Sequence, residues 1–188
     1  YLKNMPDNGS PYISATALAN ALGMGEVQVR KDLAAVSDGG RPKIGYQRLS
    51  LIDDIEQFLG YDNTTDAVLI GAGKLGQALL GYSGFGDYGL NILAAFDVAP
   101  ESGGDMAGKP IFHISQLESF CRTHKVLMGI ITVPGPQAQQ VCDQLISCGI
   151  KAIWNFAPTH LEVPPNILVQ YENMATSLAV LSMHLQAQ

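Results

Sequence analysis

Three glycines one third of the way along the chain have the spacing Gly71-x-Gly73-x-x-Gly76. They follow an apolar run, so the sequence predicts a buried strand that turns into a helix. In such a turn the first glycine allows a tight bend, the second lets the backbone approach phosphates, and the third allows the helix to pack closely. The predicted residues of a dinucleotide pyrophosphate site are Gly71, Ala72, Gly73, Lys74, Leu75 and Gly76. The alternative is a tight turn without a ligand.

An acidic residue follows the glycines at the distance that a ribose contact requires. The next predicted strand starts at Leu90 and ends on Asp97, about 20 residues after Gly76. A carboxylate there accepts hydrogen bonds from ribose hydroxyls and repels a 2′-phosphate. No arginine stands beside Asp97, so the pattern favours NAD(H) over NADP(H).

Short apolar strands alternate with helical segments from residue 66 onward, which is typical of a Rossmann-type parallel sheet in an α/β domain. The predicted strands are 66–71, 91–96, 126–133, 151–156 and 167–171, and the predicted helices are 74–81, 115–124, 136–147 and 174–186. Ligands bind at the carboxyl ends of such strands. The further candidate cofactor contacts at these ends are Thr132, Val133, Pro134 and Asn155, although each could belong to an ordinary strand-to-helix connection.

The first 60 residues predict a winged helix-turn-helix. Ser14 is a candidate N-cap for one helix, Gly23 ends that helix, and a second helix begins near Glu26. The second helix has the proportions of a major-groove reader, with Gln28, Arg30 and Lys31 outside its apolar stripe. The alternative is a small helical cap with a solvated charged loop.

Residues 38–46 have turn residues at both ends and basic residues between them, which suits a wing that contacts phosphates. Its candidate contacts are Arg41, Lys43 and Tyr46. Ser50 is a candidate N-cap for a third helix, and the polar stretch 60–65 marks a domain boundary. The predicted domains are 1–60, 66–171 and a C-terminal helix over 173–188 with an apolar stripe, which must pack on its own domain or on a partner.

Charge and cysteine content limit the classes of protein to which the chain can belong. The net charge of −6 conceals six basic and four acidic residues in the first 50, against five basic and thirteen acidic in the rest. The three cysteines lack metal-ligand spacing and read as reduced thiols of a cytoplasmic protein, with no metal site. No apolar run reaches the ~20 residues that cross a bilayer, so no membrane is expected as a partner.

An enzyme would need a proton donor or acceptor near the cofactor. Of the histidines His113, His124, His160 and His184, only His160 lies near the predicted ligand edge. No substrate domain follows the nucleotide fold. The residues therefore favour binding without turnover, and no catalytic residue is assigned.

The order of the motifs along the chain resembles that of the Rex family of bacterial redox-sensing transcriptional repressors. The matching segments are Val29–Leu33, Ile44–Tyr46, Gly71–Gly76, Gly84–Gly86, Ala95–Val98, Thr132–Pro134 and Asn155–Pro158. The resemblance covers almost the whole chain. It implies a homodimer with N-terminal winged helices, Rossmann domains that bind NAD(H), and a C-terminal helix exchanged between subunits. It also implies that NADH weakens binding to operator DNA whereas NAD⁺ permits it.

The resemblance also implies a switch. Tyr82 matches a tyrosine near the nicotinamide that pairs, in relatives, with an aspartate at the start of the exchanged helix. That aspartate is Asn173 here, and Lys3 matches its alternative basic partner, so the charge-based switch should weaken. The wing reads Pro42-Lys43 where the family has Arg-Gly, which displaces its basic contacts by one position. The match of Tyr1–Lys3 to the middle of the family's first helix predicts further residues upstream.

Two alternatives to a redox-sensing repressor remain from the sequence. The first is an NAD-dependent oxidoreductase, which turnover of NADH with a carbonyl compound would support. The second is a regulatory module that binds CoA or a nucleotide without DNA. Asp97 argues against CoA, and competition between CoA and NADH would decide.

Overall fold

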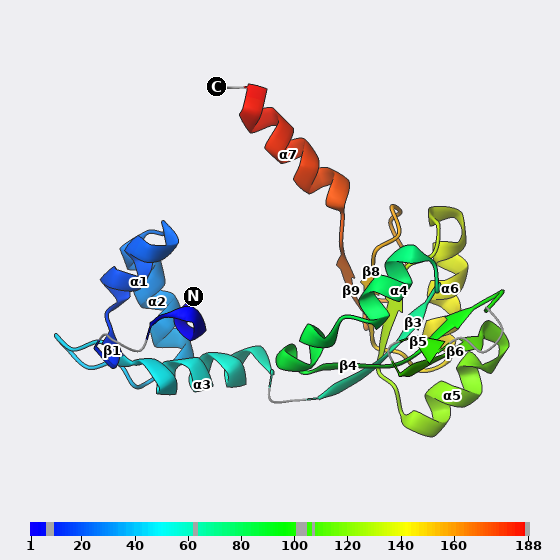
Figure 1. The fold of residues 1–188 in the computed structure, drawn as a ribbon, viewed down its shortest axis with the longest axis horizontal. Helices are drawn as coiled ribbons and strands as arrows, with labels where there is room; N and C mark the ends of the chain where they lie inside the picture. The colour runs from blue at the N-terminus through cyan, green and yellow to red at the C-terminus, as the bar shows by residue number, and fades with distance from the viewer. Residues whose placement is uncertain (7–9, 62–63, 101–104, 107, 187–188) are drawn as a thin grey trace. The chain divides into compact units, whose positions relative to one another are not determined.

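The computed structural model describes residues 1–6, 10–61, 64–100, 105–106 and 108–186. The chain divides into two compact units, Tyr1–Asn63 and Thr64–Gln188. Figure 1 shows the first unit as a small helical body and the second as a sheet covered by helices.

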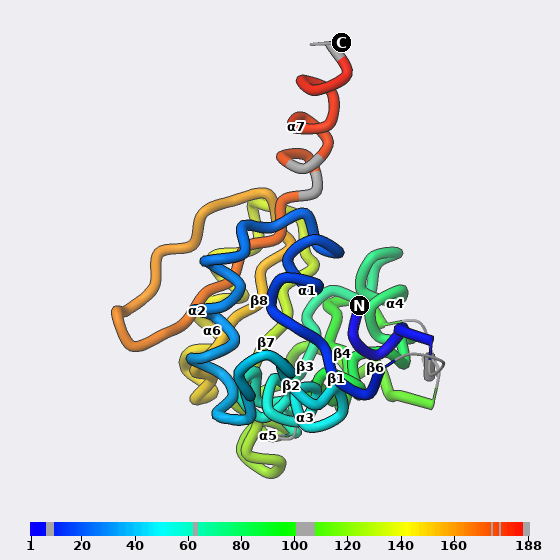
Figure 2. Tube along the Cα trace, turned by 90° about the vertical axis from the view of Figure 1, so that its left-hand side faces the viewer, coloured from blue at the N-terminus to red at the C-terminus, as the bar shows by residue number. Residues whose placement is uncertain are grey.

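The N-terminal unit is a helix-turn-helix closed by a short antiparallel pair of strands. Its elements are η1 (Leu2–Asn4), β1 (Tyr12–Ile13), α1 (Ala15–Leu22), α2 (Glu26–Val36), β2 (Tyr46–Gln47) and α3 (Arg48–Leu59). Strands β1 and β2 pair side by side (Figure 2). The predicted ends of α1 are confirmed, because Ser14 Oγ accepts a hydrogen bond from the Ala17 N–H and Gly23 is left-handed at φ 64°.

The core of this unit consists of apolar side chains from all three helices and both strands, namely Ile13, Leu18, Ala19, Val29, Leu33, Tyr46 and Leu51. Helix α3 begins three residues earlier than it would with Ser50 as its N-cap. The Gln47 side chain fills that role, because its Oε1 accepts the Ser50 N–H at 2.6 Å. An amide side chain therefore satisfies the backbone donor that the sequence assigned to a serine.

The second unit is a seven-stranded sheet with the order β5-β6-β4-β3-β7-β8-β9. Its strands are β3 (Thr65–Ile70), β4 (Leu90–Asp97), β5 (Asp105–Met106), β6 (Lys109–His113), β7 (Met128–Ile131), β8 (Ala152–Asn155) and β9 (Leu168–Tyr171). All neighbours are parallel except β5 and β6. This confirms the α/β class with a Rossmann-type sheet.

Helices cover both faces of the sheet. They are α4 (Lys74–Leu80), η2 (Ser83–Tyr88), η3 (Ile114–Gln116), α5 (Leu117–His124) and α6 (Gly135–Ser147). Helix α7 (Met174–Gln186) follows the last strand and contributes no described residue to the cores on either face. Alternate residues of β3 point to opposite faces: Val68 and Ile70 pack with α5 and α6, whereas Leu69 packs with Leu80 of α4. Strand β3 is therefore buried on both sides, as its continuous apolar run predicts.

Strand β6 is absent from the strands predicted by the sequence. It begins Lys109-Pro110, four of its five residues are only partly buried and His113 is exposed, so its apolar signal is short and interrupted. It pairs with β4 through Asp97↔His113, which extends the sheet beyond the strand that carries the acidic residue.

Helix α7 leaves its apolar stripe uncovered by the rest of the described chain. Leu178, Leu181 and Leu185 are all exposed. These three leucines belong to the stripe predicted from the sequence, and no described residue of their own domain covers them.

Candidate functional site

The glycine turn after β3 is tight because another strand end presses on it. Gly71 has φ 102°, and a Cβ there would lie 2.9 Å from Val133 Cγ1 and 3.0 Å from the Thr132 carbonyl carbon. Its N–H donates to Phe96 O at 2.8 Å. The ends of β4 and β7 thus hold this residue from both sides, and only glycine fits.

Gly76 allows the first turn of α4 to rest directly on that bend. A Cβ at Gly76 would lie 1.9 Å from Gly71 O, closer than any real contact. The sequence prediction that the third glycine serves close packing is therefore confirmed by the geometry.

Gly73 differs from the other two glycines. Its φ of −68° suits any L residue, and a Cβ there would meet no atom within 4 Å. Neither its backbone conformation nor its neighbours require glycine. The open space beside Gly73 leaves room for a pyrophosphate to approach the backbone, as it does in this type of turn, and this contact stays a prediction.

Asp97 lies at the same turn. Its Oδ2 accepts the Ala72 N–H at 2.7 Å and its Oδ1 accepts the Ala99 N–H at 2.9 Å. Each carboxylate oxygen keeps a lone pair for a further donor. The side chain is half-buried, so it can fix the turn and still face a ligand hydroxyl.

Thr132 and its neighbours form the opposite wall of the turn. The Thr132 Oγ1 lies 2.7 Å from Gly71 O and 3.0 Å from Ile70 O, so its one proton is shared between two carbonyls. Val133 contacts Gly71 and Pro134 is the N-cap residue of α6. The hydroxyl therefore positions the glycine turn, while the wall that it belongs to lines the candidate site.

Asn155 is fully buried, with 0% of its surface exposed. Its Nδ2 donates to Ala157 O and Thr159 O, and its Oδ1 accepts the Ala157 N–H. All its strong hydrogen-bonding groups are engaged within the loop after β8. The structure gives Asn155 the role of shaping this loop, and its contact with a cofactor stays a prediction.

A row of aromatic side chains runs from Tyr82, which the sequence analysis named, to Trp154, which it did not. The Tyr82 ring is edge-on to Phe85 at 4.9 Å, Phe85 to Trp154 at 5.6 Å, and Trp154 lies 4.8 Å from Phe156. A Cβ at Gly84 would lie 2.5 Å from the Tyr82 ring, so glycine lets the ring fold back. The Gly84-Phe85-Gly86 segment is the feature of the sequence from which this arrangement of Tyr82 and Phe85 could have been predicted.

A cavity of about 650 Å³ opens where β8 and β9 end and α7 begins. Phe156, Thr159, His160, Tyr171 and Asn173 are among its lining residues. His160 stacks on Tyr171 at 5.2 Å. The sequence placed His160 near the ligand edge, and here its ring is a wall of this cavity.

The exposed face of α2 carries the predicted DNA contacts, because Val29 and Leu33 turn inward. Arg30 forms an ion pair with Glu26 one turn earlier. The Gln28 Nε2 donates to Asp32 Oδ1 at 2.6 Å. Lys31 is exposed and forms no ion pair with any described residue.

The predicted wing is a tight loop and not a long hairpin. Arg41 and Gly45 exchange both backbone hydrogen bonds at 2.9 Å, and Lys43 at the tip has φ 67°. Both basic side chains are exposed. Tyr46 is 9% exposed and belongs to the core, with Gly40 against its ring, so the structure gives it the role of supporting the loop, and its contact with DNA stays a prediction.

The switch residues are engaged locally within their own units. Lys3 forms an ion pair with Glu56 of α3. Asn173 Oδ1 accepts the Thr176 N–H at 3.1 Å and thus caps the first turn of α7.

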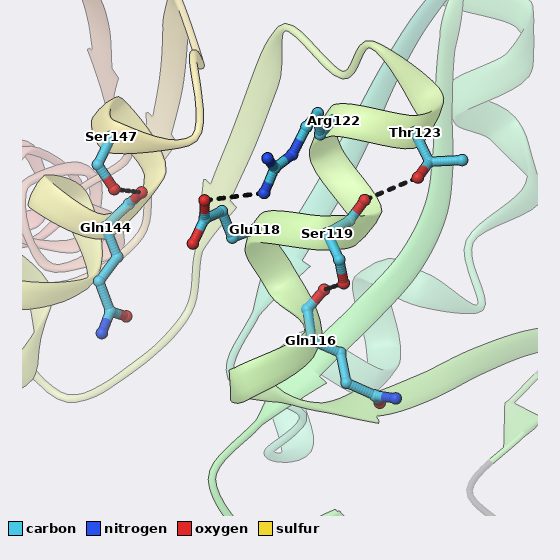
Figure 3. Close-up of polar contacts among 7 residues, drawn as sticks. All are labelled: Gln116, Glu118, Ser119, Arg122, Thr123, Gln144 and Ser147. Atoms are coloured by element: carbon cyan, nitrogen blue, oxygen red, sulfur yellow. Dashed lines mark hydrogen bonds and ion pairs between the residues drawn. The ribbon is translucent and has the colours of Figure 1, made fainter.

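Burial keeps the thiols of two cysteines protonated. It raises the pKa of Cys121 to about 12 and that of Cys142 to about 11. Among the described residues no group of three metal-ligating side chains occurs. The polar contacts of α5 and α6 drawn in Figure 3 join residues three or four positions apart, including the Glu118–Arg122 ion pair, so they stabilise helices and form no site.

Within the described part of the chain, no helix has the length and apolar character that a bilayer crossing requires.

Each of the two units matches a model of a known protein family. A family model described as "CoA binding domain" matches residues 62–159, and one described as "Putative DNA-binding protein N-terminus" matches residues 1–34. The redox-sensing transcriptional repressor Rex of Treponema denticola is 42% identical over 171 residues, which cover 90% of this chain and 81% of that protein. The chain belongs to the Rex family.

Other Rex proteins match over similar lengths. That of Bacteroides fragilis is 40% identical over 96% of this chain and 84% of its own length. A solved Rex-family repressor, RSP, is 32% identical and covers this whole chain. Its structure in complex with NAD⁺ and operator DNA superposes with a TM-score of 0.92 over 87% of that chain, and its NADH complex with 0.89 over 88%. The Rex relatives are named as transcriptional repressors.

Proposed function

We propose that this protein is a transcriptional repressor that reports the NADH/NAD⁺ ratio, with NADH releasing it from operator DNA. One observation carries the proposal: the whole chain matches a Rex-family repressor that has been solved with NAD⁺ and operator DNA and with NADH. The open space at Gly73 supports it independently, because it fits the close approach of a pyrophosphate.

The cofactor is held at the glycine turn. Backbone N–H groups of residues 73–76 at the start of α4 face the pyrophosphate, because the Ala72 N–H is taken by Asp97, and the free lone pairs of Asp97 accept the ribose hydroxyls. The negative charge of Asp97 disfavours a 2′-phosphate, so the ligand is NAD(H) and not NADP(H). Thr132–Pro134 form the wall and Tyr82 lies near the nicotinamide. The bound cofactor supplies a redox-dependent charge and shape, and this function assigns no catalytic residue.

DNA contacts come from exposed side chains of the first unit. Lys31 offers an ammonium that no described carboxylate pairs, while Glu26 holds the Arg30 guanidinium on one flank of α2. Arg41 and Lys43 approach the phosphate backbone from the loop. Gln28 adds an amide on the other flank of α2, and amides recognise base edges.

The protein acts as a homodimer in which α7 buries its leucine stripe against a second copy. This assignment is supported by the exposure of Leu178, Leu181 and Leu185. Two first units then meet successive half-sites. NADH must bind the DNA-incompetent arrangement more tightly than the competent one, because equal affinity for both would shift nothing. The protein is cytoplasmic, where operator DNA and NADH are both present.

The test is operator binding at fixed salt with NAD⁺ and with NADH. NADH lowers the affinity for DNA and NAD⁺ preserves it. If NADH leaves the affinity unchanged, the sensor proposal is wrong.

A second candidate function is binding of CoA by the second unit, which the family model over residues 62–159 favours. Competition separates the two candidates. CoA displaces bound NADH if the site accepts it, and Asp97 predicts that it does not, because the carboxylate faces the 3′-phosphate-bearing ribose of CoA.

A further inference from the structure

One valine of α2 lies outside the core of the first unit. Val27 is 70% exposed, whereas Val29 and Leu33 are buried in the core of the first unit. Helical spacing puts Val27, Lys31 and Ala34 on a single stripe opposite that core. Alanine at this position would form the helix better, because valine loses side-chain freedom there.

The residues that flank this stripe are held away from it. Arg30 is tied back to Glu26, and Gln28 is tied forward to Asp32. The stripe itself therefore presents a branched apolar group in the first turn of α2, then one ammonium, then a small methyl. Small residues allow the helix backbone to come close to whatever it docks against.

A DNA major groove is the surface that this stripe fits. The groove displays an apolar group only at thymine, whose 5-methyl projects from the base edge. In helix-turn-helix proteins the first residues of the second helix reach the base edges. Lys31 on the same stripe supplies the charge that phosphates or guanine acceptors require.

We propose that Val27 is a specificity-determining residue that contacts a thymine methyl group in the operator. This inference rests on the proposed DNA-binding function. It adds to that function one apolar contact that favours thymine over any pyrimidine without the methyl.

The test removes the apolar contact in two ways: deoxyuridine lacks the methyl group of thymine, and Val27→Ala lacks the γ-methyl groups of the valine. The operator of the full-length chain is first selected from a random duplex library, and each thymine is then replaced singly by deoxyuridine. Burial of one methyl corresponds to roughly fourfold in affinity. At one or two positions the wild type should therefore bind the uracil duplex about fourfold more weakly, whereas Val27→Ala should bind both duplexes equally.

Two further variants serve as controls. Val27→Thr keeps one γ-methyl and should retain part of the thymine preference. Leu168→Ala truncates a side chain that is 73% exposed on β9 of the second unit, and it should keep the full preference. NADH affinity and circular dichroism of Val27→Ala should match the wild type, because the side chain is 70% exposed and lies outside the core cluster of its unit.

The inference is overturned if the wild type binds thymine and uracil duplexes equally at every position, or if Val27→Ala keeps the wild-type preference. A selection that returns no preferred duplex has a different meaning. It contradicts the proposed repressor function itself, and this inference falls with it.

Discussion

Gly73→Ala should lower the affinity for NADH without lowering the stability of the fold. The φ of −68° at Gly73 accommodates alanine, and a Cβ there would meet no protein atom within 4 Å. Alanine also reduces the freedom of the unfolded chain, which stabilises a protein by about 0.4–1 kcal/mol. Because Gly73 is the N-cap of α4, where alanine is less favoured than glycine, these effects offset one another.

The effect on NADH should be large. A methyl that occupies the space of a phosphate forces the ligand or the turn to shift, and overpacking of this kind costs about 1–3 kcal/mol. That corresponds to a loss of NADH affinity of roughly 5- to 150-fold. The melting temperature without ligand should change by no more than about 2 °C, because 1 kcal/mol corresponds to about 2–4 °C in a chain of this size.

Titration of NADH by fluorescence and thermal denaturation of the ligand-free protein measure the two quantities. Gly25→Ala is the matched control, because Gly25 is also an N-cap, has φ −69° and faces open space in the first unit. It should bind NADH as the wild type does. Gly76→Ala should lose both stability and affinity, since its Cβ would lie 1.9 Å from Gly71 O. Wild-type NADH affinity in Gly73→Ala would refute the assignment of this turn to the pyrophosphate.

Three further predictions concern charge. Asp97→Asn keeps an acceptor for the Ala72 N–H but removes the negative charge, so the ratio of NADPH to NADH affinity should rise about tenfold in paired titrations. Lys31→Ala should weaken operator binding and lower the salt-dependence slope by about 1, with unchanged NADH affinity. Burial raises the pKa of Cys121 to about 12 and of Cys142 to about 11, so both thiols should react slowly with iodoacetamide at pH 8 until urea unfolds the chain. The same shifts favour the folded state below about pH 8.5, and this contribution is lost as pH rises toward the folded values.

The glycine turn was predictable because its signals are local. The order of strand, three glycines and helix sets the backbone of residues 71–76, and each glycine role was assigned from spacing alone. The distance to Asp97 was also predictable from the sequence, although the chain between fills it with α4, η2 and β4 and not with one helix and one strand. The hydrogen bond from the Ala72 N–H to Asp97 could not be predicted from the sequence, because it depends on the register of β3 against β4.

The roles of Tyr46 and Asn155 could not be assigned in the same way. Both lie beside residues that suit a ligand, and both have side chains that can bind one. Whether such a side chain faces outward depends on packing from distant segments: Tyr46 is buried with residues of α1, α2 and α3, and Asn155 is saturated by its own loop. Strand β6 was missed for a related reason, because its pairing with β4 compensates for a weak apolar pattern.

The magnitudes also limit how the cofactor could control DNA binding. Moving a two-state equilibrium from 1:99 to 99:1 requires about 5.5 kcal/mol of differential binding. The ion pair between Lys3 and Glu56 lies within the first unit with its lysine exposed, and exposed pairs contribute about 0–1 kcal/mol. Asn173 carries no charge and already caps α7. An exchange of the Lys3–Glu56 ion pair for a contact with the neutral Asn173 would therefore supply too little free energy to release the protein from operator DNA. In a dimer, two cofactors could divide the requirement, and each would then need about 2.7 kcal/mol, or roughly 100-fold, in favour of the DNA-free arrangement.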